Sequence, residues 1–417
     1  MAMTETLTVS LAPASKRAPA AAVPCAALLD EHGARVILGA TCDPLGLAQP
    51  VVPSATSMFG PRGVCAAPDG SLWVSDTGHH RVLGWLRAPT ADNTPADILL
   101  GQPAFDREGR NARGNTSRDS MNVPTGITAC GIDGAGLAVA DAWNHRVLIW
   151  HRRPTLSHPS AHQPPDVVLG QADFDGGESN RGHDRPTAST LFWPYCVAWD
   201  GARLWVTDTG NRRVLMWTGL PEQNGAQASL VLGHPGFDQR DENDGSEPTA
   251  ASMRWPHAIS FPNGGLCVAD AGNNRLMVWH DAPLANNQAC NLLIGQSDAR
   301  HVEHNQASYY PDAACLNMPY GAAVARDLLV VADTANSRLL AWRIDEVMQD
   351  TLNCNGRNAC ALAAQPDWNS KGDNRWQHAA RDSVCWPYSV ALQGDDTLLI
   401  ADSGNNRVML WPLAGGA

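Results

Sequence analysis

TDTGNRRVLMW, residues 207–217, aligns without a gap with five other segments of this 417-residue chain. In each copy an Arg follows an Asp by five positions, and a Trp follows that Arg by four. Successive Asp residues lie between 62 and 69 residues apart. One repeat therefore organises the whole chain. The other copies are SDTGHHRVLGW (75–85), ADAWNHRVLIW (140–150), ADAGNNRLMVW (269–279), ADTANSRLLAW (332–342) and ADSGNNRVMLW (401–411).

The residues around each copy predict four β-strands per repeat. A short β-prone run leads into the Asp and another follows the Arg, which predicts a hairpin around the turn. A third run further downstream ends in Gly-Gln, as in DVVLGQ at residues 166–171. A Pro opens a strand upstream, where it removes no ladder hydrogen bond. Six repeats of four antiparallel strands predict an all-β, six-bladed propeller. The prolines are Pro61, Pro124, Pro194, Pro256, Pro319 and Pro387.

The sixth repeat lacks a fourth strand, and the start of the chain supplies a candidate. The sequence ends six residues after Trp411, whereas ARVILGATCD at residues 34–43 matches the fourth-strand pattern. We therefore expect this N-terminal strand to complete the last blade and close the ring, which removes the open sheet edges. Residues 34–417 then form one propeller domain. Residues 1–33, rich in Ala and Pro, are expected to be a flexible tail.

The pattern from Asp208 to Trp217 resembles the NHL repeat family, and the resemblance covers residues 34–415. It implies a propeller that serves one of several unrelated purposes, namely protein docking, RNA binding or catalysis at the central pore. It also suggests an accessory subunit of a larger enzyme, such as a redox metalloenzyme.

Composition narrows the range of partners. The formal net charge is −12, which disfavours nucleic acid and anionic membranes because binding to phosphates depends on Lys and Arg. There is no apolar run of about 20 residues and no signal-peptide pattern. The 11 cysteines are an odd number without a secretory signal, so reduced thiols and a cytoplasmic location are expected. We predict no cofactor and no metal.

The residues repeated in every blade are predicted to build the fold. Asp and Asn favour tight turns, Arg can bridge neighbouring turns, and the repeated Trp is expected between blades. Function is expected where the repeats differ, beside the Pro that enters the innermost strand near the channel mouth. Aromatic residues and Arg are typical of binding hot spots. The predicted partner-binding residues are Arg62, Tyr195, His257, Tyr320, Tyr388, Trp193, Trp255 and Trp386. The alternative is that they pack beneath the long loops.

Enzymatic six-bladed propellers offer an alternative function. In the amidating lyases, which this chain could resemble, His residues after the repeat Pro of alternate blades hold zinc. The matching positions here are Thr125, His257 and Tyr388, and one imidazole does not make a zinc site. Calcium-dependent lactonases need oxygen ligands, yet no Asp, Glu, Asn or Gln flanks the repeat prolines. We predict a non-catalytic platform that docks a protein through its long-loop face, with no catalytic residues. A pore-centred, metal-dependent lyase or hydrolase is the alternative.

Overall fold

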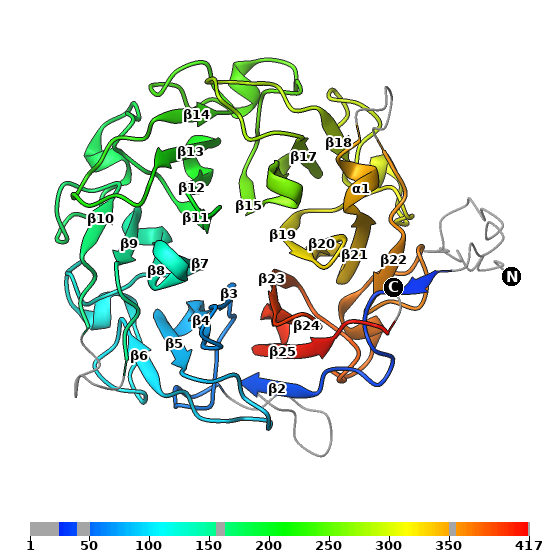
Figure 1. Ribbon diagram of the computed structural model, residues 1–417, viewed down its shortest axis with the longest axis horizontal. Helices are drawn as coiled ribbons and strands as arrows, with labels where there is room; N and C mark the ends of the chain where they lie inside the picture. Colours follow the sequence, from blue (N-terminus) through cyan, green and yellow to red (C-terminus); the bar gives the residue numbers. More distant parts are fainter. Residues whose placement is uncertain (1–24, 40–50, 156–162, 350–355, 416–417) are drawn as a thin grey trace, which may run out of the picture.

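Six four-stranded antiparallel sheets surround a central axis in this computed structural model, and the chain runs once around the ring (Figure 1). The structure describes residues 25–39, 51–155, 163–349 and 356–415. Residues 1–24 of the predicted tail and residues 40–43 of the predicted closing strand lie outside these ranges. The predicted all-β, six-bladed propeller is confirmed.

The blades follow one another in sequence order. Blade one contains β3 (Gly63–Ala66), β4 (Leu72–Asp76), β5 (Arg81–Trp85) and β6 (Ile98–Leu100). Blade two contains β7 (Pro124–Cys130), β8 (Gly136–Asp141), β9 (Arg146–Trp150) and β10 (Val167–Leu169). Blade three contains β11 (Pro194–Trp199), β12 (Arg203–Asp208), β13 (Arg213–Thr218) and β14 (Leu230–Leu232). Blade four contains β15 (Pro256–Ser260), β16 (Leu266–Asp270), β17 (Arg275–Trp279) and β18 (Leu292–Ile294).

The last two blades include the N-terminal strands. Blade five contains β19 (Pro319–Ala325), β20 (Leu328–Asp333), β21 (Arg338–Arg343) and β22 (Ala361–Ala363), with β1 (Ala26–Ala27) added to its edge. Blade six contains β23 (Pro387–Gln393), β24 (Thr397–Asp402), β25 (Arg407–Pro412) and β2 (Val36–Gly39). One short helix, α1 (Ile344–Val347), follows β21. No helix in the described part of the chain is long and apolar enough to cross a bilayer.

The Asp and Arg of each repeat form a buried ion pair that joins loops to the blade. In every blade the Arg Nε lies 2.6–2.9 Å from Asp Oδ2. In blade three, Arg213 Nη2 also donates to the carbonyls of Thr187 and Thr190 in the preceding connection, while Asp208 Oδ1 accepts from the Phe192 amide. These contacts confirm the predicted structural role of the repeated charges.

An apolar cluster fills each of the six contacts between neighbouring blades, and each cluster contains one repeated Trp. The indole N–H of each Trp donates to a main-chain carbonyl, so its burial leaves no donor unpaired. The predicted position of these residues between blades is confirmed. They are Trp85, Trp150, Trp217, Trp279, Trp342 and Trp411, all at most 3% exposed.

The N-terminal strand closes the ring as predicted. β2 pairs antiparallel with β25, placing Val36 opposite Leu410 and Leu38 opposite Val408. Figure 1 shows it, in blue, beside the red C-terminal strand. The Trp411 indole donates to the Asp30 carbonyl, so the segment before β2 also contributes to the closure.

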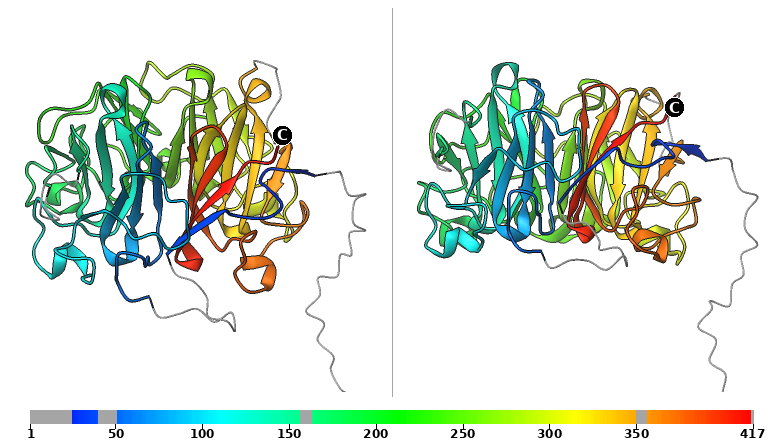
Figure 2. Two further views of the ribbon diagram at one scale, coloured as in Figure 1. Left: turned by 60° about the horizontal axis from the view of Figure 1, so that its bottom comes forward. Right: turned by 90° about the horizontal axis from the view of Figure 1, so that it is seen from below.

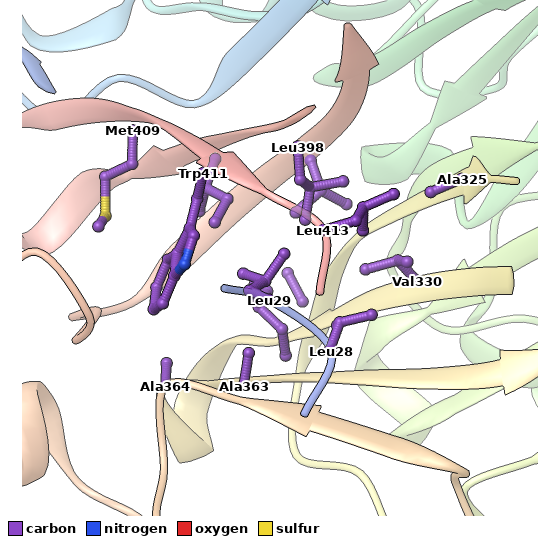
Figure 3. Close-up of a cluster of buried hydrophobic side chains, with 14 of the residues drawn as sticks. Leu28, Leu29, Ala325, Val330, Ala363, Ala364, Leu398, Met409, Trp411 and Leu413 are labelled. Atoms are coloured by element: carbon purple, nitrogen blue, oxygen red, sulfur yellow. The ribbon is translucent and has the colours of Figure 1, made fainter. Parts of the chain in front are cut away.

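Residues 25–33 were expected to belong to the flexible tail, and this part of the prediction is wrong. β1 pairs parallel with β22 of blade five, and Leu28 and Leu29 are 0% and 3% exposed. Both leucines lie in the apolar cluster between blades five and six, close to Leu413 and Trp411 (Figure 3). Burial of two leucine side chains between the blades stabilises the ordered segment, although the Ala-rich composition around them favours a flexible chain.

The two faces of the ring differ in their connections (Figure 2). One face is formed by the Asp-to-Arg turns and by the connections that run from the fourth strand of one blade to the first strand of the next blade. We call it the long-loop face. Pairing of Pro124 with Asp141 and of Pro194 with Asp208 places the start of each innermost strand at this face. The opposite face carries the hairpins between the first and second strands, such as residues 131–135.

Candidate functional site

The residue before each repeat Pro has left-handed backbone geometry, with φ between 51° and 58° in all six blades. A non-glycine residue pays a steric cost there, and five of the six are not glycine. In five blades the amide of this residue is held from the preceding blade by the residue that ends its Asp-to-Arg turn. His145 Nδ1 accepts from the Trp193 amide at 3.0 Å, and Ser337 Oγ accepts from the Trp386 amide at 3.2 Å. In these five blades the neighbouring blade therefore helps to fix the entry of the innermost strand.

The residues after the repeat prolines gather at one end of the central channel. The His257 ring stacks on the Tyr320 ring with centroids 4.2 Å apart and an interplanar angle of 8°. The Tyr195 ring also lies 4.2 Å from the His257 ring, tilted by 48°. Tyr388 lies 4.8 Å from Tyr320, and the Arg62 guanidinium lies 4.7 Å above the Tyr388 ring. We call these five residues the channel ring.

Burial differs among the eight predicted binding residues. Tyr195 and His257 are each 3% exposed and Tyr320 is 9% exposed. Trp193, Trp255, Arg62 and Tyr388 are half-buried, and Trp386 is 36% exposed. Thus the structure brings together five of the eight residues inside the channel. The three tryptophans lie outside the ring, where Trp193 packs edge-on against Tyr195 and His257.

His257 is a neutral imidazole of defined tautomer. Its Nδ1 lies 2.7 Å from the Trp255 carbonyl, which can only accept, so Nδ1 carries the proton and Nε2 keeps a lone pair. Burial lowers the pKa of His257 to about 4, and the nearby Arg62 charge acts in the same direction. The ring is thus uncharged at His257 near neutral pH.

The tyrosines of the channel ring stay protonated. Burial raises the pKa values of Tyr195, Tyr320 and Tyr388, while Arg62 opposes that increase in each. The buried Tyr195 hydroxyl makes no hydrogen bond of normal length, although the Arg62 guanidinium lies near enough to influence its pKa. A buried hydroxyl without a partner is uncommon in native proteins and costs free energy.

Arg62 carries the ring's positive charge without a matching anion. Among the described residues, no carboxylate oxygen lies within 4.0 Å of its guanidinium. By contrast, the six repeated arginines all pair with Asp. An unpaired, half-buried guanidinium suits an anion that enters from solvent.

The channel ring lines one end of a cavity of about 440 Å³. This is within the usual size of small-molecule sites, roughly 300–1,000 Å³. Its walls come from the innermost strands and expose polar and apolar atoms about equally, with Ile127, Val197, Ile259 and Val390 among the apolar side chains. Among the described residues, no Asp, Glu or Lys lines it.

The positions compared above with a zinc site do not converge. Thr125 is fully buried, and its hydroxyl donates a hydrogen bond to the Tyr195 carbonyl at 2.7 Å. Thr125 therefore helps to hold the Tyr195 main chain in place. Among the described residues, no three His, Cys, Asp or Glu side chains gather as metal ligands. What this end of the channel offers is one cation, phenolic hydroxyls and one imidazole lone pair.

Sequence reasoning missed one repeated polar pair. In blades two to six an Asn of the long connection exchanges two hydrogen bonds with the Asn of the Asp-to-Arg turn, as between Asn180 and Asn211 at 2.9–3.0 Å. The signal was present, since an Asn stands 30–33 positions before each turn Asn. Blade one has His79 at this turn position, and its Nδ1 lies 2.8 Å from Asp76. The connection residues are Asn111, Asn180, Asn243, Asn305 and Asn374.

Parts of this chain are similar in sequence to known proteins. Residues 60–85 match the family model described as NHL repeat. NHL repeat-containing protein 2 of Homo sapiens is 23% identical over 360 residues, which cover 82% of this chain and 45% of the human protein. The protein of the same name from Bos taurus matches with the same figures. The chain spans about half the length of the curated relatives it matches.

Among solved structures, Kuenenia stuttgartiensis hydrazine synthase aligns at 12% identity with a TM-score of 0.48, over 86% of this chain and 97% of that one. A streptogramin B lyase aligns at 11% identity with a TM-score of 0.42, over 87% of this chain and 96% of that one. The repeat match, the relatives and the six blades agree. The chain is therefore a six-bladed β-propeller that is similar to NHL-repeat proteins, with one of its repeats matching the NHL model.

Proposed function

We propose that the chain is a non-catalytic platform that docks a protein partner through its long-loop face. One observation carries this proposal, namely the distribution of exposed aromatic side chains. Every such side chain among the described residues belongs to a connection or turn of that face. They are Phe59 (50% exposed), Trp143 (58%), Tyr309 (64%), Tyr310 (50%), Trp376 (78%) and Trp386 (36%). Aromatic rings are the residues that most often dominate binding energy at interfaces.

Four of these residues lie on two adjacent connections that are fastened to each other. The Lys371 ammonium donates to the Tyr309 carbonyl at 2.6 Å and lies 3.9 Å from the Tyr309 ring centre. Asn369 donates to the Pro311 carbonyl. We call Tyr309, Tyr310, Trp376 and Trp386 the aromatic patch. Because its connections are cross-linked by hydrogen bonds, the patch loses little conformational entropy on binding.

Trp376 and Trp386 are linked through a shared partner. Ser337 Oγ donates to the Asp373 carboxylate at 2.7 Å and accepts from the Trp386 amide at 3.2 Å. Asp373 begins the short turn that ends at Trp376.

The net charge of −12 favours a partner that is apolar at the centre of its docking surface and basic around it.

Two further observations support the proposal. The human relative contains about as much chain again beyond the matched region, which supports a propeller that works beside other protein parts. All nine cysteines of the described residues are free, which supports a reducing compartment such as the cytoplasm. An accessory subunit of a larger enzyme is the form of this function that we propose.

A pull-down from native lysate, with the wild-type protein and matched variants as baits, tests the docking face. The amount of partner that each bait retains is measured. The wild-type protein is compared with Tyr309→Ser/Trp376→Ser/Trp386→Ser and with Ile132→Ser/Leu284→Ser as a control. Ile132 and Leu284 are 87% and 88% exposed and belong to the opposite face. We expect one partner to be retained by the wild type and the control and lost by the patch variant.

The captured protein is then purified and its Kd measured. Single Ala changes at Trp376 and Trp386 should weaken binding by about 1–3 kcal/mol each, the hot-spot range. Equal capture by all three proteins, or loss only in the control variant, would refute docking through this face.

A further inference from the structure

We propose that the channel ring is a binding site for a small organic carboxylate, held by Arg62 at its charged end and by apolar side chains of the channel walls along its body. This inference is independent of the docking proposal, because it uses none of the residues of the aromatic patch. It rests on four features of the channel, which are its unpaired cation, its unpaired hydroxyl, the apolar side chains of its walls and its opening.

The charge of the channel end calls for an anion. Arg62 is half-buried, stacks on Tyr388 and has no carboxylate within 4.0 Å among the described residues. No acidic residue of the described ranges lines the cavity. In a chain with net charge −12, leaving one inner arginine without an acidic partner is unexpected unless another anion balances it. The planar guanidinium binds a carboxylate with two parallel hydrogen bonds.

The hydroxyl of Tyr195 adds a donor. It is buried, it makes no hydrogen bond of normal geometry among the described residues, and the Arg62 guanidinium beside it can only donate, so the hydroxyl proton has no acceptor. A carboxylate oxygen placed against Arg62 gives this hydroxyl the partner that it lacks. The raised pKa of Tyr195 is consistent with a phenol that donates.

The walls favour an organic ligand over an inorganic one. Beyond the ring the lining of the cavity combines polar atoms with apolar side chains of the innermost strands, among them Phe261, Val324 and Leu392. An apolar body of the ligand gains about 25 cal/mol per Å² of surface removed from water there. Inorganic phosphate would occupy only the charged end of the 440 Å³ cavity.

Entry is available from the face opposite the long loops. A second pocket, lined by Pro68 and by residues 131–134 of the hairpin loops, shares Cys65, Ala66, Thr128 and Trp199 with the channel cavity. The channel ring therefore lines the inner end of a passage whose mouth lies among short hairpins. A docked protein on the long-loop face would leave this mouth open.

Titration calorimetry with 2-naphthoate alone tests the site. We expect saturable one-to-one binding, with 2-naphthamide, a neutral molecule of the same shape, at least about tenfold weaker, since the charge-assisted bonds to Arg62 are lost. Arg62→Gln should weaken 2-naphthoate at least about tenfold, and Tyr195→Phe several-fold. Arg254→Gln is the matched control, because Arg254 also lies over an aromatic ring, at 5.0 Å from the Trp255 centre, but does not line the cavity.

Each variant is first shown to be folded by its circular dichroism and unfolding transition. If Arg62→Gln does not fold, Arg62→Lys replaces it, and loss of the bidentate contact should still weaken binding by several-fold. The proposal is overturned if folded wild-type protein shows no saturable binding of 2-naphthoate, or binds 2-naphthamide equally well. It is also overturned if the Arg62 variant binds 2-naphthoate like the wild type, or if inorganic phosphate binds and 2-naphthoate does not.

Discussion

In each blade, one buried Asp carboxylate helps to hold the long loops in place. Each repeated Asp uses one oxygen for the Arg and the other for a main-chain amide just before the first strand of the same blade, as Asp208 does with Arg213 and Phe192. Burial raises the pKa of Asp208, Asp270 and Asp402, and the paired Arg opposes it. In blades one to five the Arg of each pair also donates to the connection before the blade and to the connection after it, so these long loops are held to the blades.

Histidines at blade contacts make the stability of the fold depend on pH. His145 Nδ1 must be unprotonated to accept the Trp193 amide, and burial lowers its pKa to about 4. In the unfolded chain the pKa is near 6.5. The unfolded state therefore binds more protons between pH 4 and 6.5, so the free energy of unfolding falls as the pH falls through that window.

We predict that His145→Asn weakens this pH dependence. Asn occupies the same left-handed position in blades four and six, where Asn274 and Asn406 accept the equivalent amides. The variant should match the wild type at pH 7 within about 1 kcal/mol. It should lose less stability on acidification, by up to about 3 kcal/mol at pH 4. Urea unfolding at several pH values measures this, and parallel curves for both proteins would contradict it.

At this scale the sequence predicted eight residues near the channel mouth, but neither which five of them meet nor how deeply they lie. The five members of the channel ring were identified because they follow the repeat prolines. Their burial depends on mutual stacking, as between His257 and Tyr320. That contact joins blades four and five, so no single repeat contains the information. The unpaired state of Arg62 is likewise a property of the assembled channel.

At the scale of elements, the main error of the prediction from sequence concerned β1 and the residues that follow it, which were expected to be part of a flexible tail. Two alanines form β1, and the composition of residues 1–33 gives no strand pattern. The segment is nevertheless held by two blades, since Leu28 N donates to the Leu362 carbonyl and Ala414 N donates to the Leu28 carbonyl. Local propensity could not predict this pairing, because the partners are more than 300 residues away in sequence.

We predict that Leu28→Ala destabilises the protein by about 2–5 kcal/mol, the usual cost of removing a buried leucine side chain. Leu28 is fully buried in the cluster between blades five and six. Leu284→Ala is the control, because Leu284 is 88% exposed and its loss should change stability by less than about 0.5 kcal/mol. Thermal and urea unfolding measure both. Similar small effects would mean that residues 25–33 add little to the closure.

At the scale of the whole molecule, the repeat alone predicted the architecture. Four strands per copy, six copies and a displaced fourth strand specify a closed ring, and β2 completes blade six as expected. The function was less predictable, because what repeats in every blade builds the fold and only the differences between blades form sites. Among the exposed aromatic residues of the long-loop face, Tyr309, Tyr310 and Trp376 come from connections of unlike sequence, so no repeat pattern marks them, whereas Trp386 was identified beside the repeat Pro.

Closure makes the ring one cooperative unit, which leads to a last prediction. β2 supplies Val36 and Leu38 to the cluster between blades six and one, while Leu28, Leu29 and Ile37 belong to the cluster between blades five and six. A chain that begins at residue 40 loses both contributions and leaves the edges of β25 and β22 unpaired.

We expect that shortened chain to unfold over a broader range of urea, with a smaller dependence of the free energy on denaturant, and to associate through its bare edges. A chain that begins at residue 25 keeps β1 and β2, and it should unfold like the full-length protein. Urea titration with light scattering distinguishes the two. If the chain from residue 40 unfolds in one sharp transition with an unchanged midpoint, the other blade contacts hold the ring without the N-terminal strands. Closure by β2 would then be a consequence of the fold and not a condition for it.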